Sequence, residues 1–129
     1  MRILIADDHP AVRRGLREIL ADMFPAAFFS EAEDGGEALR YLEESEFDAL
    51  FLDINMPGRS GLDILQDVKR TYPRLPVIVV SVQPEEQYAT RCLRAGAAAY
   101  INKDNASDEM VMVAKTILGS SPSASPSFA

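Results

Sequence analysis

Five short apolar runs recur along the chain at roughly even spacing. They are Ile3–Ala6, Ala27–Phe29, Ala49–Leu52, Val77–Val80 and Ala98–Ile101. The first, third and fourth runs are continuous rather than alternating, which is typical of strands covered on both faces. These runs therefore predict the strands of a parallel β-sheet.

Between the runs, apolar residues recur with the 3.6-residue period of amphipathic helices. The predicted stripes are Val12/Leu16/Ile19/Leu20/Met23, Ala38/Leu39/Leu42, Leu62/Leu65/Val68, Tyr88/Cys92/Leu93 and Met110/Val113/Ala114/Ile117/Leu118. On the first helix this pattern leaves Arg13, Arg14 and Arg17 facing outward. On the fourth it places Cys92 in the core, as a packing residue rather than a reactive one.

Residues that favour helix ends agree with these limits. Pro10 and Pro84 suit first helical positions, Asp34 with Glu37 and Ser60 with Asp63 have capping-box spacing, and Gly96 suits a C-cap. Strand and helix thus alternate five times, which predicts an α/β domain with right-handed crossovers. We expect this domain to span residues 1–118, followed by a Ser/Pro-rich tail or linker over residues 119–129.

Composition narrows the function classes. The chain has 129 residues, which suits one domain, and its formal net charge of -7 disfavours nucleic-acid binding through its own field. One cysteine and one histidine exclude a disulfide framework and a multi-Cys zinc site. No apolar run approaches the roughly 20 residues of a membrane span, and Met1–Ala6 lacks the features of a signal peptide. We therefore expect a cytoplasmic location and no membrane partner.

Acidic and polar residues follow the predicted strands directly. Asp7 and Asp8 follow the first strand, Asp53 the third, Ser81 ends the fourth, and Lys103 lies just past the fifth. In an open α/β sheet the ligand crevice lies outside the carboxyl ends of the strands. If these strands are neighbours, the five side chains converge on one pocket.

Such a pocket needs a cation. Two like charges about 4 Å apart repel by about 4 kcal/mol at an effective dielectric of about 20. Carboxylate oxygens without Cys or His clusters suit Mg²⁺, and Lys103 is suited to pair with a phosphoryl group. A carboxylate beside Mg²⁺, Lys and Ser is the set of groups that forms an aspartyl-phosphate.

Each residue also has a simpler interpretation when it is taken alone. Asp7 and Asp8 equally suit a helix cap, Lys103 a solvated surface, and Ser81 a turn. His9 is better explained as a cap or surface residue than as a catalytic one. Only the joint placement at strand ends favours a phosphoryl site.

The motifs resemble those of a known family. They are Asp7–Pro10, Leu52–Gly58, Ser81, Gly96–Ala97 and Tyr100–Lys103. Together they resemble the receiver domain of two-component response regulators, over about residues 1–118. Further motifs, Asp8–Arg13, Gly15–Leu16 and Lys103–Asp104, are similar to the LuxR-type (NarL/FixJ) subgroup, whose full-length members carry a C-terminal helix-turn-helix DNA-binding domain.

The resemblance implies a flavodoxin-like (CheY-like), doubly wound five-stranded sheet in the order 2-1-3-4-5, with helices on both faces. It implies that Asp53 accepts a phosphoryl group from a sensor histidine kinase. It also implies Mg²⁺ ligation by Asp8, Asp53 and the backbone carbonyl of Asn55, with Asp7 acting through water. Lys103 would pair with the phosphoryl oxygens.

The resemblance further implies a conformational switch that regulates transcription. Ser81 would move toward the phosphoryl group, and Tyr100 would turn into the space that Ser81 leaves. On the last predicted helix, Met112 faces away from the core stripe, which makes it a candidate homodimer contact, although a lone exposed Met is also common.

Three alternatives stay open beside the transcription regulator. A stand-alone receiver would act by protein docking. A degenerate receiver would act only as a scaffold, although Asp7, Asp8, Asp53, Ser81 and Lys103 are all present. A Mg²⁺-dependent phosphohydrolase of the haloacid-dehalogenase type would need a second Asp where Asn55 stands.

Overall fold

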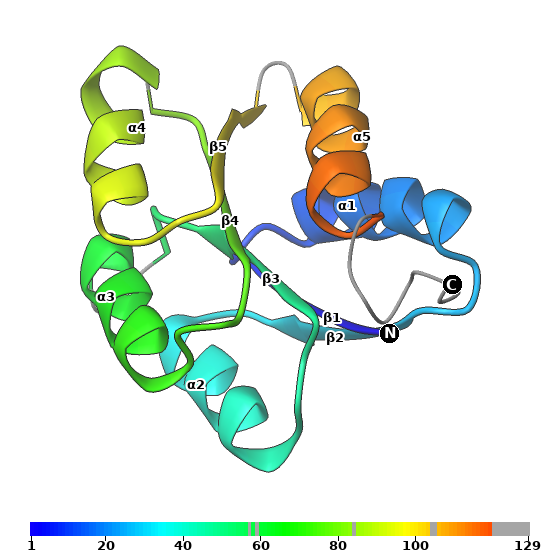
Figure 1. The fold of residues 1–129 in the computed structure, drawn as a ribbon, viewed down its shortest axis with the longest axis horizontal. Coiled ribbons are helices and arrows are strands. Elements are labelled where there is room, and N and C mark those ends of the chain that lie inside the picture. Colours follow the sequence, from blue (N-terminus) through cyan, green and yellow to red (C-terminus); the bar gives the residue numbers. More distant parts are fainter. Residues whose placement is uncertain (57, 59, 84, 104–105, 120–129) are drawn as a thin grey trace.

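Five strands alternate with five helices in the computed structural model, which describes residues 1–56, 58, 60–83, 85–103 and 106–119 (Figure 1). The strands are β1 (Arg2–Ala6), β2 (Phe28–Ala32), β3 (Ala49–Asp53), β4 (Val77–Ser81) and β5 (Ala99–Asn102). The helices are α1 (Pro10–Met23), α2 (Gly35–Glu44), α3 (Gly61–Thr71), α4 (Glu85–Arg94) and α5 (Ala106–Ile117). The predicted alternation is confirmed.

All strand pairs are parallel, and the sheet order is β2-β1-β3-β4-β5. This is the order that the resemblance implied. In register, Ala6 lies opposite Leu52, and Asp53 lies opposite Val80. The carboxyl ends of β1, β3, β4 and β5 are therefore consecutive along one edge.

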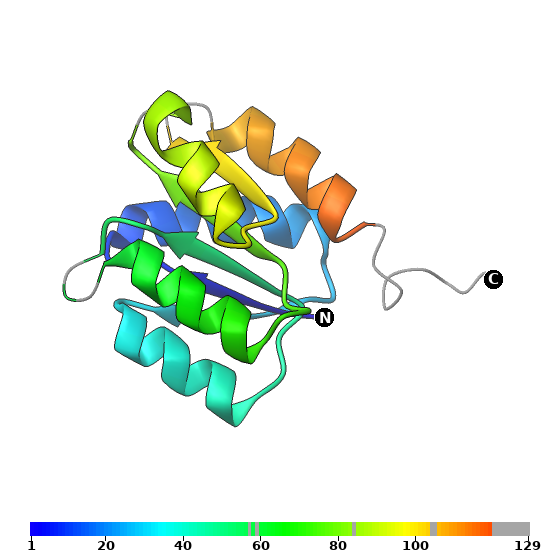
Figure 2. The ribbon, with the colours of Figure 1, turned by 60° about the vertical axis from the view of Figure 1, so that its left-hand side comes forward.

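Helices cover both faces of the sheet, with α1 and α5 on one face and α2, α3 and α4 on the other (Figures 1 and 2). Alternate residues of β1 serve the two layers. Ile3 and Ile5 pack in the cluster that includes residues of α1 and α5, whereas Leu4 and Ala6 pack in the cluster under α2, α3 and α4. This double burial explains why the strand sequences are continuously apolar.

The predicted helix ends are largely found. Helix α1 begins at Pro10, the Asp34 carboxylate accepts a hydrogen bond from Glu37 N at 2.8 Å, and Ser60 Oγ accepts one from Leu62 N. Gly96 lies at a φ of 109° and ends α4 with two hydrogen bonds, Gly96 N to Leu93 O and Ala97 N to Cys92 O. These bonds form a Schellman motif, in which glycine avoids the steric cost of positive φ. Pro84 lies outside the described residues.

Gly61, the first residue of α3, allows a close backbone approach. A Cβ atom at this position would lie 2.3 Å from the backbone oxygen of Ile54, which is closer than real Cβ contacts come. The absence of a side chain therefore lets the helix start pack against the segment that follows β3. That segment carries Asn55.

Three predictions about local structure are wrong. Strand β2 covers Phe28–Ala32 rather than Ala27–Phe29. It is an edge strand, so it includes the half-buried polar residues Ser30 and Glu31, which an apolar run does not reveal. Leu93 is 48% exposed, since it lies beside the buried side of α4 that Cys92 occupies. Arg13 is buried rather than outward, with only 9% of its surface exposed.

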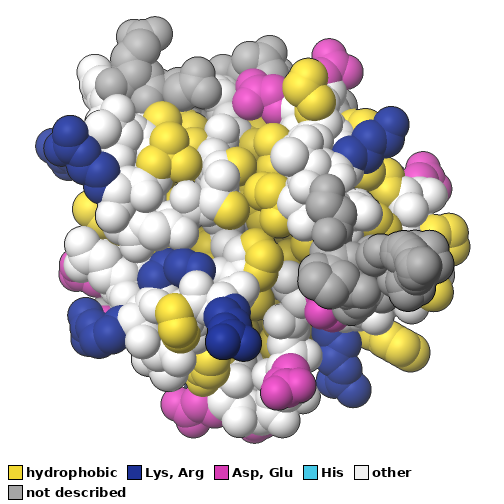
Figure 3. Space-filling view, viewed as in Figure 1, with side chains coloured by type: hydrophobic (Ala, Val, Ile, Leu, Met, Phe, Trp, Pro, Cys, Tyr) yellow, Lys and Arg dark blue, Asp and Glu magenta, His cyan; other side chains and the backbone are white. Residues whose placement is uncertain are grey.

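Charged side chains of both signs are interspersed on the face shown in Figure 3. On that face the net charge of -7 does not gather into one acidic patch. In the described part of the chain, no helix is both long and apolar enough to cross a bilayer. The predicted tail, residues 119–129, lies outside the described residues except for Gly119, and so it stays a prediction.

Candidate phosphoryl and metal site

The sheet brings the predicted site residues to one edge. Asp7 and Asp8 follow β1, Asp53 and Ser81 are the last residues of β3 and β4, and Lys103 follows β5. Because these four strands are adjacent, the predicted convergence is realised for the three carboxylates and Lys103.

Short turns orient three of these side chains. In each, a side-chain oxygen accepts a hydrogen bond from the backbone N–H two residues later, which is the Asx- or ST-turn geometry that ends a strand. The bonds are His9 N to Asp7 Oδ1 (2.8 Å), Asn55 N to Asp53 Oδ1 (2.9 Å) and Gln83 N to Ser81 Oγ (3.0 Å). The residues that carry the chemistry thus also shape the loops that hold them.

The acidic cluster consists of Asp7, Asp8 and Asp53. One ligand atom from each of these residues, together with one from His9, lies within 4.8 Å of the others. Asp7 and Asp53 are each 1% exposed. Asp7 Oδ2, Asp8 Oδ1 and Asp53 Oδ2 are buried and accept no hydrogen bond from the described residues. Buried carboxylate oxygens without donors are costly, so the cluster is suited to a cation.

Lys103 offsets part of this charge. Its Nζ lies 3.0 Å from Asp7 Oδ2 and 3.3 Å from Asp53 Oδ2, and its side chain is only 11% exposed. These are ion-pair distances. A buried ammonium between two carboxylates attracts both without filling their coordination positions.

Burial raises the pKa of the Asp53 carboxyl above its ordinary value of 3.8, and the neighbouring Asp7 charge acts in the same direction. The hydrogen bond from Asn55 N and the Lys103 charge lower the pKa, but not enough to reverse the shift. The site therefore holds a carboxylate whose negative charge is poorly solvated.

His9 is closer to the cluster than the sequence indicated. It is the N-cap residue of α1 and its side chain is 59% exposed, as expected for a cap or surface residue. Its Nδ1 also lies 3.0 Å from Asp7 Oδ1 and 3.0 Å from Asp8 Oδ1. Its position next to Asp8 in sequence could have signalled this contact.

Ser81 and Tyr100 are linked through Gln83. Ser81 Oγ donates to Asn55 Oδ1 at 3.0 Å and accepts from Gln83 N. The Tyr100 hydroxyl donates to Gln83 O at 2.8 Å, and Tyr100 is only 7% exposed. Tyr100 therefore already lies inward in this structure, and Ser81 reaches Asp53 only indirectly, through Asn55.

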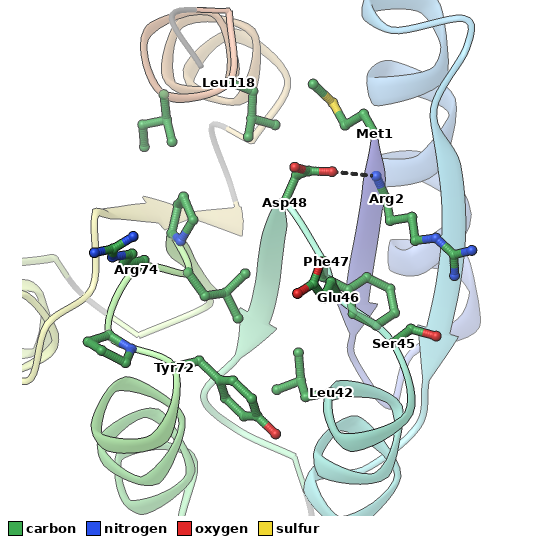
Figure 4. Close-up of a pocket in the computed structure, with 14 residues that line it drawn as sticks. Met1, Arg2, Leu42, Ser45, Glu46, Phe47, Asp48, Tyr72, Arg74 and Leu118 are labelled. Atoms are coloured by element: carbon green, nitrogen blue, oxygen red, sulfur yellow. Dashed lines mark hydrogen bonds between the residues drawn. The ribbon is translucent and has the colours of Figure 1, made fainter. Parts of the chain in front are cut away.

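In the described part of the chain, cavities also lie outside the cluster. A groove of about 1040 Å³ lies at the amino ends of the strands, lined by residues that include Leu42, Phe47, Tyr72 and Leu118, with Arg2 N bonded to Asp48 beside it (Figure 4). Its size would favour it as a ligand site, but none of the clustered carboxylates reaches it. A smaller cavity of about 200 Å³, lined in part by Asn55, Gln83 and Arg91, borders the loops of the site.

The donor set suits a hard divalent cation. Carboxylate oxygens are the ligands that Mg²⁺ prefers, and it binds through one or a few of them while keeping several waters. The orphaned oxygens of Asp7, Asp8 and Asp53 could supply these ligands. Fold and site together define a doubly wound α/β protein with an acidic, metal-competent pocket at the carboxyl edge of its sheet.

Residues 3–115 match the family model described as response regulator receiver domain. The chain belongs to this family, and it is the receiver domain of a response regulator, a class of signalling switch. The resemblance drawn from the motifs is confirmed.

The chain is similar to response regulator GacA of Pseudomonas viridiflava, with 34% identity over 129 residues. The match covers 100% of this chain but 60% of that relative's length. A solved two-component response regulator of the LuxR family from Aurantimonas sp. SI85-9A1 is 29% identical, with a TM-score of 0.81 over 95% of this chain and 91% of that one. This likeness agrees with the LuxR-type motifs.

Response regulator protein TrrA of Thermotoga maritima, solved in complex with Mg²⁺-BeF, is 29% identical to this chain. Its TM-score is 0.78, over 90% of this chain and 97% of that one.

Proposed function

We propose that Asp53 accepts a phosphoryl group from the phosphohistidine of a sensor histidine kinase, in a reaction that needs Mg²⁺. The observation that carries this proposal is the buried Asp53 carboxylate, which lies 3.3 Å from Lys103 Nζ in an otherwise acidic pocket. A carboxylate that lacks solvation is a better nucleophile than a hydrated one. As negative charge develops on the phosphoryl oxygens, the Lys103 ammonium can stabilise it there.

The step balances as a phosphoryl transfer. A carboxylate oxygen of Asp53 forms the new P–O bond while the P–N bond of the phosphohistidine breaks. The electron pair of that bond returns to the imidazole nitrogen, which takes up a proton. Hydrolysis later returns phosphate and the free carboxylate, so the domain assists its own phosphorylation and dephosphorylation without turning over an outside metabolite.

Asp8, Asp53 and the backbone carbonyl of Asn55 are the proposed metal ligands, with Asp7 acting through water. Bound Mg²⁺ would neutralise charge between the carboxylates and the incoming phosphoryl group. The orphaned oxygens of Asp8 and Asp53 support this assignment. The TrrA complex with Mg²⁺-BeF shows that a similar receiver fold takes this metal.

The switch runs from Ser81 to Tyr100. A phosphoryl group adds roughly -1.5 to -2 charge and three acceptor oxygens. We propose that Ser81 Oγ turns to donate to one of them, which removes its present bond to Asn55 Oδ1. Gln83 is hydrogen-bonded to both Ser81 and Tyr100. The change therefore reaches β5 through the loop that carries Gln83, and it biases an existing equilibrium between inward and outward positions of the Tyr100 side chain.

The remaining partners follow from this assignment. We propose a receiver unit over residues 1–118 followed by a linker, with DNA bound only through an output domain outside this chain. The family match over residues 3–115 supports the extent of the receiver unit, and the match to only 60% of the relative's length supports a further domain in such proteins. Met112, 68% exposed on α5, is the proposed homodimer contact. The proposed location is the cytoplasm, where a sensor kinase presents its phosphohistidine.

The test is intact-protein mass spectrometry after treatment with acetyl phosphate and Mg²⁺. We expect the wild-type protein to gain one phosphoryl group, and Asp53→Asn to gain none, because the amide cannot form the acyl phosphate. Asp63→Asn removes an exposed acid at the start of α3 and should label as the wild type does.

Removing Mg²⁺ with a chelator should abolish labelling of every variant. Undiminished labelling of Asp53→Asn would show that the phosphoacceptor lies elsewhere. Labelling that is indifferent to the chelator would remove the metal from the mechanism.

A further inference from the structure

Arg13 ties the end of β1 to the edge strand β2. Its Nη1 donates to the backbone oxygen of Asp7, and its Nε donates to Glu31 Oε1 at 2.9 Å. Its Nη2 also lies 3.9 Å from Glu33 Oε1. We propose that Arg13 is a positioning residue that holds the Asp7–Asp8 peptide in the orientation that metal binding requires, an inference that rests on the proposed function.

The Arg13 side chain is buried in the fold rather than exposed on its surface. Only 10% of the side chain is exposed, although it sits on a helix whose neighbouring arginines are exposed. Glu31 holds the guanidinium from the edge strand, and hydrogen bonds from Arg17 and Arg13 keep the pKa of that glutamate below its ordinary value. A charged, hydrogen-bonded Glu31 therefore fixes where the guanidinium points.

The hydrogen bond from Arg13 to Asp7 O fixes the backbone orientation of both Asp7 and Asp8. The peptide unit is planar, so the direction of the Asp7 carbonyl also sets the direction in which the chain leaves toward Asp8. The other side of Asp7 is fixed by its own N–H, which donates to Ala32 O at 3.0 Å. With both sides held, the carboxylates of Asp7 and Asp8 are presented together to the pocket.

Among the described residues, Arg13 contacts the backbone of the cluster and none of its carboxylates. It therefore leaves the coordination positions of the carboxylates open. Groups that orient metal ligands in this indirect way change metal affinity by about 10- to 100-fold when they are removed. Lysine would be a poor replacement, because it lacks the planar fork that reaches Asp7 O and Glu31 together.

The chain offers a matched control in Arg17, one turn along α1. Arg17 Nη1 donates to Glu31 Oε2 at 2.8 Å, so Arg17 shares the partner of Arg13 but makes no hydrogen bond or ion pair with Asp7 in the described part of the chain. Titration calorimetry with Mg²⁺ alone would compare wild type, Arg13→Gln and Arg17→Gln, well below their melting temperatures. We expect Arg13→Gln to weaken Mg²⁺ affinity about tenfold and Arg17→Gln to change it less than about twofold.

A second readout needs no metal. In the metal-free protein, Arg13→Gln should speed hydrogen exchange of the Asp7 and His9 amides, whereas Arg17→Gln should leave both unchanged. If Arg13→Gln does not fold, Arg13→Lys, which retains the charge and the apolar stem, should still lose Mg²⁺ affinity several-fold.

Equal Mg²⁺ affinity in the wild type and a folded Arg13 variant would overturn the inference and leave the proposed function intact. Equal losses in the Arg13 and Arg17 variants would also overturn it, since the effect would then come from Glu31 alone. A wild-type protein that binds no Mg²⁺ would instead defeat the proposed metal site, and the inference with it.

Discussion

Two charged regions lie within a few residues of each other and are built on opposite principles. The acidic cluster of Asp7, Asp8 and Asp53 holds buried carboxylate oxygens that accept no hydrogen bond from the described residues. In the network of Arg13, Glu31 and Arg17, both oxygens of Glu31 accept a hydrogen bond from a guanidinium. One region keeps an excess of negative charge, and the other balances its charges within the protein.

The two regions shift the pKa values of their acids in opposite directions. Burial raises the pKa of Asp53, whereas the Arg17 and Arg13 side chains lower the pKa of Glu31. A charge that the fold leaves unbalanced weakens the folded state until a ligand arrives. A charge that the fold balances strengthens the folded state and holds the neighbouring region in place. The contrast separates residues that bind from residues that position.

The largest expected effect is loss of metal from the unbalanced region. Asp8→Ala should weaken Mg²⁺ affinity by about 100-fold, or about 3 kcal/mol, as part of the roughly 4 kcal/mol that a unit charge contributes at about 4 Å. Asp7→Ala should lose less, because in the proposed site Asp7 acts through water. Titration calorimetry measures both affinities. Equal losses would mean that the two carboxylates share the metal equally.

A smaller effect concerns Asp53 in the metal-free protein. Asp53→Asn should raise stability by about 1 kcal/mol at pH 7, the lower end of the cost of a buried polar group without a partner. Folded Asp53 binds its proton more tightly than unfolded Asp53 does. Wild-type stability therefore rises as pH falls from the raised pKa toward 3.8, and the advantage of the variant disappears.

Urea denaturation of both proteins at pH 7 and near pH 3.5 measures this difference. If Asp53→Asn is less stable than the wild type at pH 7, the attraction between Lys103 and the Asp53 carboxylate outweighs the cost of burying that carboxylate.

The smallest effect has the opposite sign. Glu31→Gln should lower stability by about 0.5 kcal/mol at pH 7, within the range of partly exposed ion pairs. The stabilisation by ionised Glu31 is present above its unfolded pKa of 4.5 and is lost as pH falls through the lowered folded value. The same urea titrations should thus show the Glu31→Gln gap closing in acid as well. A gap that is independent of pH would mean that packing rather than charge holds Glu31.

Much of the fold and site could be predicted because both depend on local pattern. The double burial of β1, β3 and β4 leaves continuous apolar runs, and the alternation with helices leads to a parallel sheet. Once β1, β3 and β5 are parallel neighbours or near neighbours, the residues after them must meet at one edge. Element order thus marked Asp7, Asp53 and Lys103 as candidates, and the strand order that the family resemblance implied brought them together.

What the sequence hid depends on contacts between distant segments. Arg13 precedes Leu16 by three residues and Leu20 by seven, so it shares their buried face, but its charge suggests an outward position. Its partners are Glu31 on β2 and the backbone oxygen of Asp7, the residue that follows β1. A cation at an apolar helix position is the signal that could have predicted a buried ion pair.

Strand β2 was misplaced for a related reason. An edge strand pairs on one side only and needs less apolar surface, so its half-buried Ser30 and Glu31 do not extend the apolar run that marks an inner strand. The inward position of Tyr100 likewise depends on Gln83 O, in a loop that has no distinctive pattern.

The Ser81 hydroxyl currently braces the turn that ends β4 by accepting from Gln83 N. A hydroxyl that rotates to meet an incoming oxyanion shifts the direction of its own lone pairs, so we expect the hydrogen bond from Gln83 N to Ser81 Oγ to change in length. The same oxygen atom, Ser81 Oγ, would then contact the group in the pocket and hold the backbone turn after β4. In the proposed switch, a change at the pocket would therefore reach the turn after β4 through the Ser81 hydroxyl itself.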